Sequence, residues 1–532
     1  MTDGQPGGNH RWMVLGIIML GTFMAILDSS IVNVALPHMM AAFGVTRDEI
    51  EWVATAFMLA TAVAMPIVGW LVSRVGHKAL YLTALALFTG GSALCAFSWS
   101  YNTLVGARVI QALGGGAMQP VGMAIVADLF EPQERGRALG VWGTGIMVGP
   151  ALGPTLGGYL TDTFNWRVIF SVNLPIGVLT FLAGLAIMRA EGMEHRRRIP
   201  FDIWGFITLA LALISGLVAL ANGAEKGWSS TYIVTCLILT VIGLVLFIAI
   251  EQEVDHPLLD FALFRYRNFT LSIVLAVFRS VGLFGGVFLL PIFLQTIVGY
   301  TTIQTGLWMM PGAVAVGITM PFAGRLADRY GPRWLVTVGV LATVTSLLLY
   351  GNLDPLSSAT MIIGPQVLRG IGLALMMAPL LSAALNAVPR AQVATASSFL
   401  NVAQTVGGSF GIAVLNSYVT NSIQRHAVDE GGQFAVQSTN YARVAARLSG
   451  LVIHSPRQAE LPSQLKGAVF SARTIMQRAS VLGFDNGFVV AAIILSLGLP
   501  LALLLKPAEH HVGGGAPPPA SDSGSTAAAE TA

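Results

Sequence analysis

Residues 27–37 read Leu-Asp-Ser-Ser-Ile-Val-Asn-Val-Ala-Leu-Pro, and they close an apolar run that begins at Trp12. The run is long enough to cross a lipid bilayer as a helix. A carboxylate inside such a run is costly, and it is tolerated where it faces a protein or water-filled interior. The stretch therefore predicts a membrane-spanning chain and marks Asp28 as a candidate functional residue.

The composition of the chain indicates that lipid is its solvent. Of the 532 residues, 54% are hydrophobic and 10% are charged, whereas a soluble domain carries about 25% charged residues. The first apolar run is too long for a signal peptide, and no cleavage site of small residues follows it, so we expect it to stay in the mature protein. The two cysteines, Cys95 and Cys236, lie in apolar runs and are expected to pack as small hydrophobic side chains.

Fourteen stretches are apolar over a length that can span a membrane, which predicts an all-α integral membrane protein with fourteen transmembrane helices. They lie at about 13–36, 51–72, 79–98, 103–127, 138–160, 168–188, 203–222, 231–250, 269–297, 303–322, 334–351, 358–386, 394–418 and 482–505.

An even number of spans puts both termini on one side of the membrane, and the basic residues indicate which side. With the termini in the cytoplasm, only Arg47, Arg167 and Lys226 lie in short outer loops, and most of the 29 Lys and Arg residues lie at inner ends and loops. Cytoplasmic loops of membrane proteins carry such an excess of positive charge. We therefore expect the N- and C-termini to be cytoplasmic.

An internal repeat relates two parts of the chain. Residues 69–78 and 324–333 both read Gly-x-Leu-x-x-Arg-x-Gly-x-basic, and each follows a corresponding span. A fainter echo relates residues 106–114 to residues 364–372. Duplicated halves with a site between them are typical of transporters.

The repeat predicts the domain organisation. Residues 1–190 form an N-terminal six-helix half, and residues 191–268 form a linker with two inserted helices. Residues 269–506 form the C-terminal six-helix half, which includes a polar external segment at 419–480. Residues 507–532 are rich in Gly, Pro, Ser and Ala and should form a disordered cytoplasmic tail.

The sequence lacks the motifs of ATP-driven transport and of metal binding. No Gly-Lys-Ser/Thr triplet is present, so no ATP-binding loop of the Walker type is expected. No His-Glu-x-x-His is present, and the nine histidines form no ligand cluster within the spans, so no metal site is expected. We expect no cofactor, no nucleic-acid partner and no enzymatic activity. Transport would be driven by an ion gradient or would be passive.

Seven segments of the chain, at 27–37, 69–78, 108–116, 145–158, 166–177, 290–295 and 324–333, resemble motifs of the major facilitator superfamily in their sequence, order and placement. Within that superfamily they are most similar to the fourteen-span drug:proton antiporters of the EmrB/QacA type. The external segment and the Gly-rich tail are more similar to the EmrB branch. Two residues depart from the family pattern, since Ser73 stands where the first loop usually has an acid and Ala112 where the fourth-helix motif usually has Gly.

The resemblance implies proton-coupled export of lipophilic small molecules by alternating access across a bacterial inner membrane. It also implies a periplasmic adaptor protein and an outer-membrane channel as partners. The scarcity of membrane acids favours neutral, weakly acidic or monocationic cargo. The alternatives are an exporter of a specific metabolite, lipid or siderophore, and a non-transporting membrane sensor or scaffold.

Asp28 and Arg108 are the predicted proton-coupling residues. At 1.5 Å per helical residue they lie about 13 Å and about 8 Å below the outer face, close enough for their side chains to meet. A change in their distance or wetting would alter the proton affinity of the carboxylate. The alternative is that Arg108 only neutralises a structural acid.

Polar, basic and flexible residues within other spans are predicted to line a central substrate cavity, although hydrogen bonding between helices would explain any one of them equally well. No acid lies at the depth of Arg279 and Arg369, so these cations suit an anionic or polar neutral ligand or a structural role bonded to carbonyls. The predicted cavity residues are Asn33, Gln111, Gln119, Arg279, Gln295, Arg369, Met376 and Gln404.

Two further sets are predicted to move or seal the helices. The repeated loops would gate the inner face through tight glycine turns and basic side chains on helix ends, or would only orient the chain by charge. The glycines of the fifth span would let helices pack closely at a hinge or seal. The gating set is Gly69, Arg74, Gly76, Lys78, Gly324, Asp328, Arg329, Gly331 and Arg333, and the packing set is Gly145, Gly149, Pro150, Gly153, Gly157 and Gly158.

Overall fold

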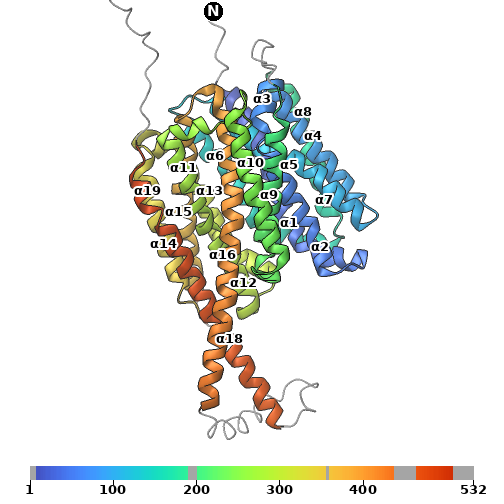
Figure 1. Cartoon of the computed structure of the whole chain (residues 1–532), viewed down its shortest axis with the longest axis vertical. Coiled ribbons are helices and arrows are strands. Elements are labelled where there is room, and N and C mark those ends of the chain that lie inside the picture. The colour runs from blue at the N-terminus through green and yellow to red at the C-terminus, as the bar shows by residue number, and fades with distance from the viewer. Residues whose placement is uncertain (1–7, 190–199, 355–356, 358, 437–462, 507–532) are drawn as a thin grey trace, which may run out of the picture.

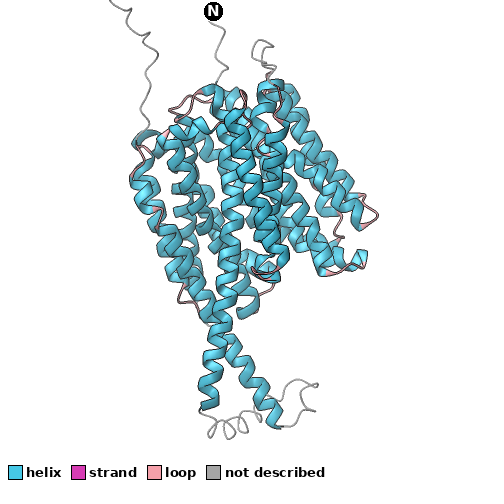
Figure 2. Cartoon of the chain, in the orientation of Figure 1, coloured by secondary structure: helices cyan, strands magenta, loops and turns pink. Residues whose placement is uncertain are grey.

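The computed structural model describes residues 8–189, 200–354, 357, 359–436 and 463–506 (Figure 1). Within these ranges the chain is helical, with no strand (Figure 2). The predicted tail at 507–532 and residues 437–462 of the external segment lie outside the described residues. The observed architecture confirms the predicted all-α fold.

The helices that precede residue 190 correspond to the first six predicted spans. They are α1 (Gly8–Phe43), α2 (Arg47–Ala64), α3 (Val68–Val75), α4 (His77–Ala96), α5 (Tyr101–Leu129), α6 (Arg135–Thr163), α7 (Val168–Ser171) and α8 (Asn173–Ile187).

The remaining helices correspond to the other eight spans. They are α9 (Ile203–Lys226), α10 (Thr231–Glu253), η2 (Phe261–Arg265), α11 (Arg267–Phe284), η3 (Gly285–Leu289), α12 (Leu290–Phe293), η4 (Leu294–Val298), α13 (Thr302–Tyr330), α14 (Pro332–Tyr350), α15 (Ala359–Asn386), η5 (Arg390–Gln392), α16 (Val393–Val436), α18 (Ser463–Ser496) and α19 (Leu499–Leu503).

Among the described residues, 12 helices are long and apolar enough to cross a membrane, or 13 if α2 and α3, which meet at 56°, form one bent span. The remaining predicted span is α6. Its 29 residues are long enough to cross a bilayer, but its many glycines and prolines make it less apolar than the others. The structure therefore places a helix at each of the fourteen predicted stretches.

Local sequence explains where several helices begin. The side chains of Thr46, Ser100 and Thr301 each accept a hydrogen bond from the backbone N–H three residues later, and the backbone N–H of each donates in return to that residue's side-chain oxygen. These reciprocal bonds are capping boxes, which satisfy amide groups that the first helical turn leaves free.

The two repeated loops have the same backbone conformation. Gly76 joins α3 to α4 with φ 82° and ψ 165°, and Gly331 joins α13 to α14 with φ 79° and ψ 167°. A positive φ at these values favours glycine, because other residues have a Cβ that would clash. The matching turns show that the sequence repeat is also a structural repeat.

The longest helix contact runs between α6 and α13, which lie antiparallel across the bundle. The two helices approach closely along the whole contact. Gly136 lies against Gly324, Gly140 against Met320, and Gly306 against Thr155. Because small residues lie at these points, the two backbones meet with little side chain between them.

The inserted helices α9 and α10 pack against each other, and α9 also contacts both α2 and α16. Leu217 and Val218 of α9 form a buried cluster with Leu59 and Ala62 of α2. At the end of α9 the Trp228 indole donates a hydrogen bond to Ser417 of α16 at 2.9 Å. Helix α9 therefore bridges two helices that are far apart in the sequence.

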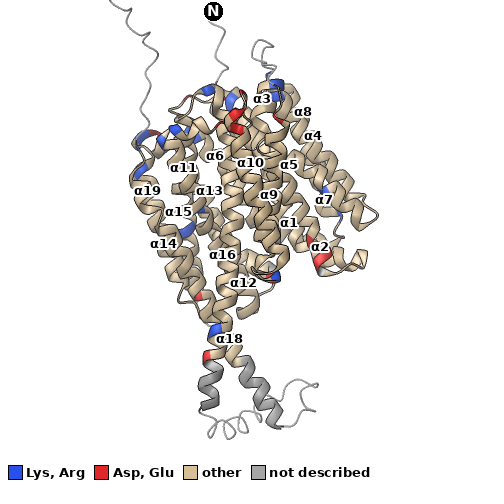
Figure 3. Ribbon diagram, viewed as in Figure 1, with Lys and Arg blue, Asp and Glu red and all other residues tan. Residues whose placement is uncertain are grey.

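Charged residues lie mainly toward the two ends of the bundle (Figure 3). The basic ones are most frequent at the end where α1 begins, and α16 and α18 extend beyond the bundle at the opposite end (Figures 1 and 3). The flanks expose large apolar residues, such as Val241 and Val245 of α10 and Val338 of α14. This surface suits a lipid environment.

Two glycines of α5 allow a direct test of the packing. A Cβ on Gly114 would lie 2.3 Å from the Ala84 carbonyl oxygen of α4, whereas a Cβ on Gly106 would meet nothing within 4 Å. We expect Gly114→Ala to lower the free energy of unfolding by about 1–3 kcal/mol because the backbones must separate. Gly106→Ala should be neutral or slightly stabilising, since Ala favours helices. Thermal unfolding in detergent measures both variants, and equal melting temperatures would contradict this packing.

Candidate functional site

The site is built around the carboxylate of Asp28 in α1, which is fully buried. Nη1 of Arg108, from α5, lies 2.5 Å from Oδ2 of Asp28. The two side chains are 0% and 1% exposed. The structure therefore brings together the two residues whose depths in the membrane were predicted to match.

The second oxygen of the carboxylate is bound by two amides. Gln111 Nε2 donates to Asp28 Oδ1 at 2.9 Å, and Asn173 Nδ2, at the start of α8, donates to the same oxygen at 2.8 Å. Both amides also donate to Ser92 Oγ of α4, at 2.6 Å and 3.1 Å. The carboxylate thus joins side chains from four helices.

Arg108 is held by other groups as well. Its Nη1 donates to Gln111 Oε1 at 2.7 Å and its Nε to the Val53 carbonyl at 3.3 Å. The guanidinium lies over the Phe57 ring, 4.0 Å from its centroid, where a cation is attracted to the π face. These contacts fix the orientation of Arg108 toward α1.

Close packing of α4 against α5 makes the network possible. A Cβ on Gly91 would lie 2.5 Å from the Gln111 Cα, so only glycine allows this approach. The next residue of α4 is Ser92, which therefore reaches both amides.

The arrangement can couple a proton to a movement of helices. The groups that reach Asp28 are all donors, since Arg108 contacts one of its oxygens and the amides of Gln111 and Asn173 contact the other. A proton on Asp28 would remove the charge that holds Arg108, so at least one donor must then move or find another acceptor. The network is sealed from solvent in this conformation, since Asp28, Gln111 and Ser92 are 0% exposed.

Some residues of the network around Asp28 were predicted from the sequence, and others were not. Gln111, predicted to line the substrate cavity, is a partner of Asp28. The contacts of Asn173 and Ser92 with this network were not predicted, although Asn173 is one of the polar residues within spans that could line a cavity. Asn173 could have been found from the sequence, since it is a polar residue at the start of an apolar span. Ser92 could not, because serine is common in helices.

The other predicted cavity residues are spread through the structure. Arg279 and Arg369 are buried in α11 and α15. Met376 of α15 is buried against α14, where a Cβ on Gly339 would lie 2.7 Å from its Cγ. The rest range from half-buried to exposed, namely Gln119, Gln404, Asn33 and Gln295.

At the end of the bundle where α1 begins, Asp328 of α13 caps the first turn of α6. Its Oδ1 accepts from the Gly136 amide at 2.9 Å and its Oδ2 from the Arg137 amide at 3.0 Å. First-turn amides have no partner within their own helix, and the positive end of the helix dipole attracts a carboxylate. Asp328 therefore ties the start of α6 to the end of α13.

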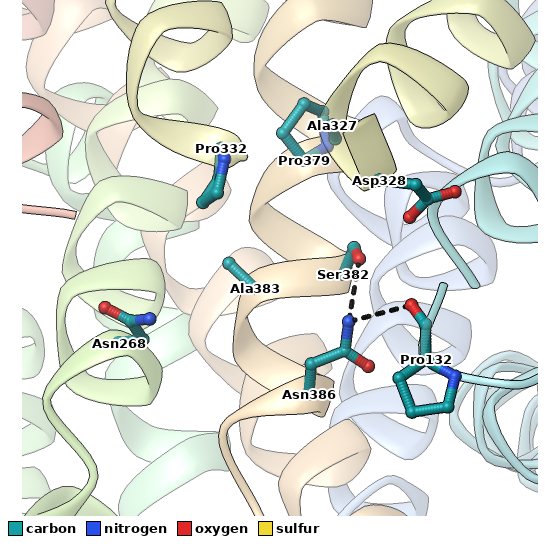
Figure 4. Close-up of a pocket in the computed structure, with 9 residues that line it drawn as sticks. All are labelled: Pro132, Asn268, Ala327, Asp328, Pro332, Pro379, Ser382, Ala383 and Asn386. Carbon is teal, nitrogen blue, oxygen red and sulfur yellow. Dashed lines mark hydrogen bonds between the residues drawn. The ribbon is translucent and has the colours of Figure 1, made fainter. Parts of the chain in front are cut away.

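A second contact lies beside this cap. Arg135 Nη1 donates to Asn386 Oδ1 of α15 at 2.9 Å, and Asn386 Nδ2 donates to the Pro132 carbonyl at 3.3 Å (Figure 4). Burial, and the nearby charge of Arg390, lower the pKa of Arg135. The adjoining cavity is about 30 Å³, too small for an organic ligand.

The first repeated loop differs from the second. Ser73 Oγ donates to the Trp70 carbonyl at 2.7 Å within its own helix, so it does not take the position that Asp328 has in the second loop. Lys78 Nζ donates to the Leu185 and Met188 carbonyls at the end of α8, as expected for a lysine at a helix C-terminus. The other basic side chains lie over neighbouring aromatic rings, namely Arg74 over Trp70, Arg329 over Tyr330 and Arg333 over Trp334.

The glycine row of α6 packs along α1 beside Asp28. A Cβ on Gly149 would lie 3.0 Å from Ile26, and one on Gly153 would lie 2.3 Å from Ser30 Oγ. Gly145 meets Met19, Gly157 meets Ile31, and Gly158 instead faces Ile303 of α13. Pro150 contributes its carbonyl as the acceptor for Ser30 Oγ at 3.4 Å. The helix that carries the acid therefore has little room to shift without moving α6.

These features define a polytopic membrane transporter, with a buried carboxylate and two repeated loops. The sequence profile of the Major Facilitator Superfamily matches residues 18–412. The chain belongs to this superfamily, which confirms the family predicted from its motifs.

Three relatives illustrate the similarity. The chain is 31% identical to the multidrug export protein EmrB of Escherichia coli K12, over 95% of this chain and 98% of that protein. It is 35% identical to the multidrug resistance protein Stp of Mycobacterium tuberculosis H37Rv, over 77% of this chain and 76% of that protein. It is 32% identical to the uncharacterized MFS-type transporter YhcA of Bacillus subtilis 168, over 95% of this chain and 94% of that protein.

The fold is also similar to a solved structure. The crystal structure of the human organic anion transporter MFSD10 (TETRAN) superposes with a TM-score of 0.56 at 16% identity, covering 92% of this chain and 100% of that chain. At this identity the similarity concerns the fold alone.

A double-mutant cycle tests the buried pair. Asp28→Asn leaves the charge of Arg108 buried without its partner, and we expect a loss of about 3–5 kcal/mol in unfolding free energy. Arg108→Gln should cost a similar amount, but the double variant should be more stable than the sum of the single losses by about 0.5–3 kcal/mol.

The control is the partly exposed pair of Arg11 and Glu134, whose N–O distance is 2.8 Å. Glu134→Gln should cost at most about 1 kcal/mol because solvent screens this pair. Strict additivity at Asp28 and Arg108 would show that the two side chains are not energetically coupled.

Proposed function

We propose that the protein is a proton-coupled efflux antiporter that exports lipophilic small molecules by alternating access. The observation that carries the proposal is the Asp28 carboxylate, buried at the junction of four helices and surrounded by hydrogen-bond donors. The multidrug relatives EmrB and Stp support the cargo class.

In the proposed cycle, Asp28 alternates between two states. When it is ionised, Arg108, Gln111 and Asn173 draw α1, α5 and α8 together, as in this conformation. When a proton arrives, the pull on Arg108 weakens and α1 can move. Because the glycine row of α6 is packed on α1, a shift of α1 is transmitted to α6 and from there to α13.

The inner ends of α6 and α13 form the proposed cytoplasmic gate. Asp328 holds the gate closed by capping α6, and the contact of Arg135 with Asn386 supports it. Ser73 at the equivalent place of the first loop gives no such cap. The gate therefore depends on one carboxylate rather than on a symmetric pair.

We also propose the orientation, the domains and the partners implied by the sequence. The gathering of basic residues at the end where α1 begins supports cytoplasmic termini in a bacterial inner membrane (Figure 3). The repeated loops support two six-helix halves at 1–190 and 269–506, joined by residues 191–268. The helical extensions of α16 and α18 support an external contact with a periplasmic adaptor.

Export of a fluorescent lipophilic dye from cells tests the coupling. We expect wild-type export to stop when an uncoupler is added, and Asp28→Asn to lower proton-driven export at least tenfold because the proton site is lost. The control is Asp48→Asn, since Asp48 is an exposed acid at the outer end of α2, and it should export normally. Wild-type export by Asp28→Asn would contradict the coupling role, and dye retention by wild-type cells would contradict efflux.

The gate is tested by thiol labelling of Thr144→Cys, because Thr144 Oγ1 lies 3.3 Å from the Gly317 carbonyl within the α6–α13 contact. In inside-out vesicles, a membrane-impermeant maleimide should react at least threefold faster when Asp328→Asn is added. The control is Asp162→Asn at the other end of α6, which should leave the rate unchanged. Equal labelling with and without Asp328→Asn would show that this carboxylate does not hold the gate.

A further inference from the structure

The C-terminal part of the bundle contains two buried cations that have no acid partner among the described residues. Arg279 of α11 is 3% exposed and Arg369 of α15 is 4% exposed. Neither arginine takes part in the ion pairs found within the described part of the chain. A buried charge without a countercharge is costly, so these positions need a physical explanation.

The internal repeat shows what is missing around Arg369. In the echo between residues 106–114 and 364–372, Arg108 aligns with Gln366 and Gln111 with Arg369. Both parts of the chain therefore place an Arg and a Gln three residues apart on one helix face. In the first part Asp28 completes the group, but no carboxylate of the described residues completes the second.

Neutral acceptors hold Arg369 in place. Its Nε and Nη2 donate to Gln366 Oε1 at 3.2 Å and 2.9 Å, and its Nη1 donates to the Leu283 carbonyl of α11 at 3.2 Å. The Tyr350 hydroxyl donates to the same Gln366 oxygen at 2.9 Å. The guanidinium is thus oriented, but its charge is not neutralised.

Arg279 has even fewer contacts. No hydrogen bond, ion pair or ring contact of its side chain is found within the described part of the chain. It lies one turn before Leu283, on the face of α11 where Leu283 and Gly286 meet Arg369. Its nitrogens are not among the fully enclosed polar atoms that lack a partner, which agrees with a side chain that is 3% exposed rather than completely sealed.

We propose that Arg279 and Arg369 form a binding site for the anionic group of a lipophilic organic monoanion, which the protein carries as cargo. Arg279 contacts the carboxylate or sulfonate directly, because its donors are free and a guanidinium matches an oxyanion with two parallel hydrogen bonds. Arg369 adds positive potential from its fixed position. The apolar cluster that the same helices contribute to, with Leu275 on α11 and Met376 on α15, accommodates the apolar body. This inference rests on the proposed efflux function.

The charge of the cargo has a consequence for energetics. For any fixed number of protons that enter, export of a monoanion moves one more positive charge inward than export of a neutral molecule. A membrane potential that is negative inside therefore drives anion export more strongly.

Three probes of one ring size test the site in proteoliposomes that have an acidic lumen and contain inside-out protein. They are naphthalene-2-sulfonate, naphthalene-2-sulfonamide and N-methylquinolinium, which are anionic, neutral and cationic. We expect Arg279→Gln to lower sulfonate uptake at least tenfold and to change the other two less than twofold. Arg279→Lys, which keeps the charge, should retain at least a third of the sulfonate uptake. Arg265→Gln removes an exposed cation and should change nothing.

Binding is measured separately as a thermal shift in detergent. Naphthalene-2-sulfonate should stabilise the wild-type protein and Arg279→Lys, but not Arg279→Gln. Sulfonate uptake at the wild-type rate by Arg279→Gln overturns the proposal. Equal loss of all three probes by a monodisperse Arg279→Gln protein also overturns it, since that result indicates a structural role.

The outcomes separate this inference from the proposed function. If wild-type protein transports the neutral or cationic probe but neither transports nor binds the sulfonate, the anion site is wrong and efflux stands. If no probe is transported but the sulfonate shift depends on Arg279, efflux is wrong and the anion site stands. Dissipating the membrane potential with valinomycin and potassium should slow sulfonate uptake more than sulfonamide uptake, and equal slowing contradicts an anionic cargo.

Discussion

Burial of one carboxylate in a lipid-spanning bundle is the constraint on which the N-terminal part of this structure depends. Asp28 cannot be left without partners at that depth, so Arg108, Gln111 and Asn173 converge on it from α5 and α8. Their convergence requires helices that approach closely, which glycine provides between α4 and α5 and between α6 and α1. The buried carboxylate needs nearby donors, and the glycine packing brings the helices that carry them close enough.

The two copies of the internal repeat differ in where their charged residues lie. The first part of the chain has a buried acid, Asp28, within the bundle but Ser73 in its repeated loop, whereas the second part has buried arginines within the bundle and Asp328 in its repeated loop. The two repeats therefore place their functional candidates differently: an acid with three donors lies within the first, and a helix-capping carboxylate lies at the end of the second.

The inserted helices are part of the same bundle rather than an appendage. Helix α9 contacts α2 and α16, and Trp228 donates to Ser417 at its end. At the end of α10, Glu251 is 5% exposed and its Oε1 accepts from the Leu258 and Leu259 amides, which folds the following segment back toward the bundle. The insertion therefore connects helices on both sides of the repeat, and any movement between them must accommodate it.

The sequence by itself determined the membrane setting, the fourteen helical stretches and the repeat, because hydropathy and spacing are local properties. It also marked Asp28 as an acid in an apolar run and placed it and Arg108 at depths close enough for their side chains to meet, since helical rise is constant. Only the tertiary structure decided that Gln111, Asn173 and Ser92 surround Asp28, that Asp328 caps α6, and that Arg279 finds no partner among the described residues. These relations depend on how the helices rotate and pack against one another. The sequence of one helix does not show which face of another helix it contacts.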